Sequence, residues 1–148
     1  MKNVFLFAAM LFLGTTDLMA QTQYAIVTSV ESIIPAGLGR SRMILNKEDL
    51  NTANFTTVRT DGVKSDMGTV KREDLKIDNF EETKLLNFFS ATGINFQNVA
   101  SNDAIIAAKL NEMAAVGWEL AFVTTGVESE AGTTDGEGIF VTRYIFKR

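Results

Sequence analysis

The sequence contains no histidine and no cysteine among its 148 residues, and it contains a single proline, Pro35. The missing residue types exclude a Ser-His-Asp triad, a cysteine nucleophile, a haem-ligating histidine, a standard zinc site and a disulfide. The 18 acidic residues outnumber the 14 basic ones, and the net charge of −4 argues against a nucleic-acid partner, which would require a basic face. We therefore expect no metal, no cofactor and no nucleic acid.

The first twenty residues have the three parts of a secretory signal peptide. Lys2 supplies a positive start, an apolar run extends from Val4 to Leu13, and Ala20 provides a small residue at the cleavage position. The run is shorter than the roughly 20 apolar residues of a spanning helix. We expect residues 1–20 to be removed. The mature protein is then periplasmic or extracellular, with no membrane span and with residues 21–148 as a single α+β domain.

Four segments of the mature chain have the composition of β-strands. Tyr24–Ile34 and Arg40–Leu45 are rich in branched apolar residues and flank a turn that contains Pro35, which predicts an antiparallel pair. Trp118–Thr125 and Ile139–Lys147 are similar and flank a long acidic, glycine-rich loop. For residues 46–77 we expect two or three short strands, with a hairpin at Asp61-Gly62.

Two further segments are predicted to be helices. In Asp78–Gly93, Asp78 with Glu81 three residues later matches a capping box. In Asn102–Val116, the residues Ile106, Leu110 and Met113 share one helical face, and the helix has Ser101 or Asn102 as its cap and Gly117 as its end. The order of elements predicts an antiparallel sheet of four to five strands with two helices packed on one face.

The second helix and the strand after it contain a recognisable motif. Leu110-Asn111 is followed by Gly117-Trp118-Glu119-Leu120, and the chain closes on residues 144–148, YIFKR. This motif resembles a small bacterial domain of unknown function. The whole mature chain is similar to uncharacterised secreted proteins of Bacteroidetes, which share residues 32–43, 87–103 and 126–129. The resemblance implies an exported α+β domain, and it offers no activity to carry over to this chain. We expect Trp118 to close the edge of the core as a large aromatic side chain; the alternative is that it forms a platform for a ligand.

The best candidate binding residues are Gly37, Gly39, Arg40 and Arg42. Glycines allow backbone N–H groups to approach an anion, and two arginines on one face of a strand can bind phosphate, sulfate or carboxylate. The alternative is a tight hairpin whose arginines are solvated and paired with acidic neighbours. The pattern is not a phosphate-binding loop, because it lacks the Gly-Lys-Ser/Thr ending and the following helix.

Acidic residues offer two weaker candidates. The loop 126–138 contains Glu128, Glu130, Asp135 and Glu137, but their spacing does not match a calcium loop. Glu112 and Glu119 flank the Gly-Trp corner and are the carboxylates we consider for glycan hydrolysis.

The sequence therefore favours an exported, non-enzymatic domain that binds a small anion, a peptide or a protein. The alternatives are a carboxylate-dependent glycan hydrolase outside the cell, and a structural or assembly subunit that uses an exposed sheet edge.

Overall fold

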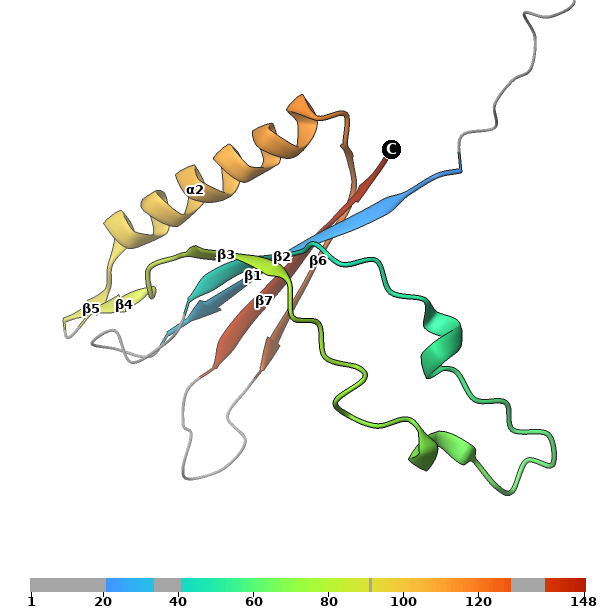
Figure 1. Cartoon of the computed structure of the whole chain (residues 1–148). Coiled ribbons are helices and arrows are strands. Elements are labelled where there is room, and N and C mark those ends of the chain that lie inside the picture. Colours follow the sequence, from blue (N-terminus) through green and yellow to red (C-terminus); the bar gives the residue numbers. More distant parts are fainter. Residues whose placement is uncertain (1–20, 34–40, 91, 129–137) are drawn as a thin grey trace, which may run out of the picture.

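The computed structural model describes residues 21–33, 41–90, 92–128 and 138–148 (Figure 1). The predicted signal peptide and most of the acidic loop lie outside these ranges. The described part is a mixed fold of one α-helix and one five-stranded antiparallel sheet, with strand order β3-β2-β1-β7-β6. The strands are β1 (Tyr24–Ser32), β2 (Arg42–Asn46), β3 (Phe80–Lys84), β6 (Glu119–Glu128) and β7 (Ile139–Lys147). A small hairpin joins β4 (Phe89–Ser90) to β5 (Gly93–Ile94).

The core lies between the sheet and the helix. Side chains alternate between the two faces of a strand, so Val27, Met43, Leu45 and Phe146 point to one face, and all four are buried. The helix α2 (Phe96–Ala115) lies across this face and contributes Ile106 and Met113 to the core (Figure 1). The predicted antiparallel pairing of the first two strands is confirmed, and β7 has the bounds expected from the sequence.

The beginning and the end of α2 are set by local hydrogen bonds. Asn95 Oδ1 accepts from the backbone N–H groups of Gln97 and Asn98 in the first turn, and the Asn95 carbonyl also accepts from Asn98 N–H. At the other end Gly117 adopts φ +86°, a left-handed conformation that favours glycine and ends the helix as predicted. None of the helices in the described ranges is long and apolar enough to cross a membrane.

The helix predicted over Asp78–Gly93 is wrong, and the number of helices on the sheet is one rather than two. Residues 80–84 form β3, which pairs with β2 in continuous register from Phe80↔Asn46 to Lys84↔Arg42. The predicted cap residue, Asp78, accepts no helical N–H; its own backbone N–H donates to Glu48 Oε1. Pairing with a neighbouring strand therefore overrides the local capping pattern.

The predicted strands of the segment 46–77 are also wrong. After Asn46, the last residue of β2, the described residues of this segment form two 3₁₀ turns, η2 (Thr52–Phe55) and η3 (Asp66–Thr69), and no further strand. A turn does form at Gly62, which has φ +72°, while Asp61 Oδ1 accepts from the N–H groups of Val63 and Lys64. Figure 1 shows the segment extending away from the sheet, and its apolar side chains are largely exposed. Without an apolar face against the core, it lacks the usual stabilisation of a strand.

Candidate functional site

The predicted anion-binding residues are described only in part. Gly37, Gly39 and Arg40 lie outside the described residues. Arg42 begins β2 on the face opposite α2, and its guanidinium forms an ion pair with Glu82 on the adjacent strand β3. A guanidinium engaged by a carboxylate has fewer donors for a ligand. An anion site at these four residues remains a prediction.

A recess of about 1010 Å³ lies at the C-terminal end of α2. Its walls come from the residues before β1, from the end of β2, from the last turn of α2, and from Trp118 and Arg148. Its lining includes the carboxylates Glu48, Asp49 and Glu112. Apolar residues such as Leu45 and Met113 and the basic residues Lys47 and Arg148 also line it, so the recess has apolar side chains beside charges of both signs.

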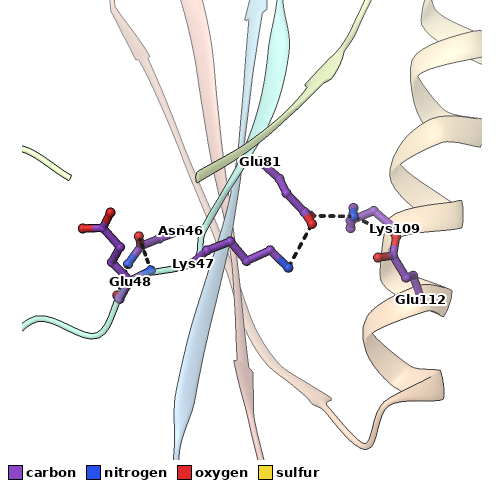
Figure 2. A network of polar contacts seen from close by, with 6 residues as sticks. All are labelled: Asn46, Lys47, Glu48, Glu81, Lys109 and Glu112. Atoms are coloured by element: carbon purple, nitrogen blue, oxygen red, sulfur yellow. Dashed lines mark hydrogen bonds and ion pairs between the residues drawn. The ribbon is translucent and has the colours of Figure 1, made fainter. Parts of the chain in front are cut away.

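An ion network ties the walls of this recess to the sheet (Figure 2). Lys47 Nζ lies 3.0 Å from Oε1 of Glu81 on β3, and Lys109 Nζ lies 3.4 Å from Oε2 of the same carboxylate. Lys109 also contacts Glu112 Oε2 at 2.7 Å, one turn further along α2. The hydrogen bond from Lys47, together with the charge of Lys109, lowers the pKa of Glu81, and the hydrogen bond to Glu112 raises the pKa of Lys109. The network holds both groups charged, as suits a structural tie between helix and sheet.

The carboxylates considered for glycan hydrolysis are each engaged by a lysine. Glu112 pairs with Lys109, and Glu119 pairs with Lys147 at 3.6 Å on the adjacent strand. Trp118 is partly buried against the core rather than fully enclosed, and the Arg148 guanidinium lies 4.4 Å from the centre of its ring. Arg148 Nε in turn donates to Gln23 Oε1, which closes this end of the sheet.

A buried polar joint holds the first half of α2 against the chain that follows β3. Asn102 is 1% exposed. Its Oδ1 accepts from the Leu86 N–H, and its Nδ2 donates to the Leu86 carbonyl and to Glu31 Oε1, all within 2.9 Å. Burial raises the pKa of Glu31, against the opposing effect of the Asn102 hydrogen bond. The sequence suggested Asn102 only as a helix cap; its burial depends on a contact with Glu31, 71 residues away.

The two edges of the sheet differ in length and charge. β3 is five residues long and carries Glu81, Glu82 and Lys84, which protect an edge against further strands. β6 is ten residues long and has no charged residue from Leu120 to Val127. A register irregularity between Leu120 and Phe122 is followed by unbroken pairing with β7. In the described part of the chain, no strand pairs with the outer edge of β6.

Both faces of β6 expose apolar side chains. Phe122 points away from α2 and is 71% exposed. Val123 and Val127 point to the side of the sheet that carries α2 and are 52% and 60% exposed. A long strand with an unpaired edge and apolar side chains on both faces is a typical docking edge for another extended segment.

Comparison with protein-family models, with curated proteins and with solved structures finds no match for this chain.

Proposed function

We propose that the mature chain is an exported, non-enzymatic binding domain, and that its partner is an extended segment of another protein added as a strand to the outer edge of β6. The observation that supports this most strongly is the uncharged stretch from Leu120 to Val127 on an edge strand. Unpaired backbone N–H and C=O groups are satisfied when such an edge gains a strand, and this provides affinity with little dependence on sequence.

The side chains of β6 define which segment would fit. Residues opposite each other on adjacent antiparallel strands have Cβ atoms about 4.5–5.5 Å apart. A partner strand would therefore place one set of alternate residues beside Phe122 and the other set beside Val123 and Val127. Because β6 exposes apolar side chains on both faces and is uncharged from Leu120 to Val127, the favoured partner has apolar or β-branched residues on both of its faces and no charge in the middle.

A displayed library of random nine-residue peptides, selected on the protein spanning residues 21–148, tests this proposal. We expect the enriched peptides to carry a central uncharged stretch of β-branched and aromatic residues. Phe122→Lys and Val123→Lys, one on each face of β6, should weaken binding of a selected peptide by about tenfold or more, because each introduces a charge that edge strands use to prevent pairing.

Asn111→Lys is the matched control, because it adds the same charge on an exposed position of α2. It should leave peptide binding unchanged. Selected peptides with no such pattern, or equal binding by all three variants and the wild type, would contradict the proposal.

A further inference from the structure

The sheet face opposite α2 carries apolar side chains beside charged ones, and α2 lies on the other face of the sheet. Antiparallel sheets with one buried face usually have polar residues on the other. Here Tyr24 and Ile26 of β1 are 68% and 46% exposed, and Val30 follows them on the same face. We name this surface the open face. By the strand register it also includes Phe122 of β6, which is exposed, and three half-buried residues, Ile44 of β2 with Val141 and Ile145 of β7. Exposed apolar surfaces of this kind mark interaction sites.

The register also places charges on the open face. One row across the sheet runs from Glu82 on β3 through Ile44 and Thr28 to Arg143 on β7. Glu82 pairs with Arg42 of its own chain. Arg143 is exposed, and none of the ion pairs within the described residues involves it. The row thus has an acidic end and, three strands away, a basic end.

We propose that the open face binds the open face of a second copy of this chain, around a two-fold axis that runs parallel to the strands between β1 and β2. Rotation about this axis places β3 of one copy opposite β7 of the other. Each row of residues across the sheet then faces the same row of the second copy. Glu82 of each copy then lies opposite Arg143 of the other, so that both unlike-charge contacts form at once. A carboxylate has two oxygens, and Glu82 can accept from its own Arg42 and from Arg143 of the second copy. This charge complementarity is what favours a second copy over an unrelated apolar partner.

The available area is compatible with a reversible dimer. Four overlapping strands spaced by about 4.8 Å cover roughly 19 Å, and the strands are about 17–30 Å long. The contact is then on the order of 450 Å² per copy and 900 Å² in total, which is below the roughly 1,200 Å² of stable specific interfaces and in the range of weak, transient ones. We therefore expect dissociation in the micromolar range. β6, with Phe122, is the part of the open face that lies outside the overlap. Its outer edge therefore stays free, and the dimer neither requires nor prevents binding at β6.

Sedimentation equilibrium on the protein spanning residues 21–148 tests the proposal. The wild type should be a monomer–dimer mixture at micromolar concentration. Arg143→Glu and Glu82→Lys should each raise the dissociation constant by about tenfold or more, because each places like charges opposite one another twice per dimer. The double variant should recover most of the loss, since the two charges are then exchanged. Lys84→Glu is the matched control, because it reverses a charge on the same face of β3. The proposed axis places the uncharged Val141 of the second copy opposite this position.

A wild type that stays monomeric at several hundred micromolar overturns the proposal, and so does a double variant that dimerises no better than the single ones. Circular dichroism spectra confirm that each variant is folded before it is compared. Peptide binding at β6 is measured on the same variants. Loss of dimerisation with retained peptide binding, or the reverse, shows which of the two surfaces has been assigned wrongly.

Discussion

Replacing Asn102 by alanine tests the buried joint between α2 and the sheet. The side chain satisfies the Leu86 N–H and carbonyl and donates to Glu31, with three hydrogen bonds of 2.8–2.9 Å. Alanine at this position leaves one backbone donor, one backbone acceptor and one half-buried carboxylate without their partner. It also leaves a small cavity, because Asn102 is fully enclosed.

The expected loss follows from these three groups. Leaving a buried polar group unsatisfied costs about 1–3 kcal/mol. Leu86 is 37% exposed, so water can replace part of what its backbone loses. We therefore expect Asn102→Ala to lower the free energy of unfolding by about 3 kcal/mol rather than by the full sum. For a domain of this size that corresponds to a fall in Tm of about 10–15 °C.

Urea denaturation of the protein spanning residues 21–148, followed by circular dichroism, measures this loss. Asn111→Ala is the control, because it removes the same side chain from an exposed position on the same helix. It should change the free energy of unfolding by no more than about 0.5 kcal/mol. If the two variants lose the same amount, the joint at Asn102 does not stabilise the fold and our reasoning is refuted.

Two other predictions concern titration and export. Burial raises the pKa of Glu31 above 4.5 in the folded state, so its favourable contribution to stability is complete below pH 4.5 and is lost as the pH rises through the folded-state pKa. Glu31→Gln should remove this decline from a pH series of urea denaturation curves, whereas parallel curves for variant and wild type would argue against it. The exported protein should begin at Gln21, and intact mass measurement of exported protein checks this; a product that retains residues 1–20 would disprove cleavage after Ala20.

The sequence predicted the strands well where the pattern is local and strong. Ile139–Lys147 matches β7, and Tyr24–Ile34 begins at the same residue as β1 and contains it. Both segments are rich in branched and aromatic residues, which favour a pleated, half-buried surface. The end of α2 was also visible, because Gly117 is a strong helix stop.

The errors in the helices have a common physical cause. Asp78 and Glu81 match a capping box, but Phe80–Lys84 gains backbone hydrogen bonds to β2 along one side and ion pairs with Arg42 and Lys47. That gain depends on residues about 40 positions away, so it cannot be seen in the local sequence. The start of α2 was placed too late because Asn102, a good cap residue, is buried inside the helix, while Asn95 is the actual cap.

The candidate binding edge was also only partly predictable from the sequence. The absence of charge from Leu120 to Val127 can be read directly from the sequence. That this strand lies at the edge of the sheet cannot, because strand order depends on which distant segments pair. The open face could not be predicted either, because only the register between β1, β2 and β7 shows that its apolar residues lie on one surface.

Backbone hydrogen exchange in β6, measured with and without a peptide selected on the protein, tests the central claim most directly. If the peptide adds as a strand, alternate amides between Leu120 and Val127 should gain protection, because only every second N–H points to the outer edge. The amides of β3 should not change. Protection that appears at the recess beside Trp118, at β3, or uniformly along β6 would contradict the account.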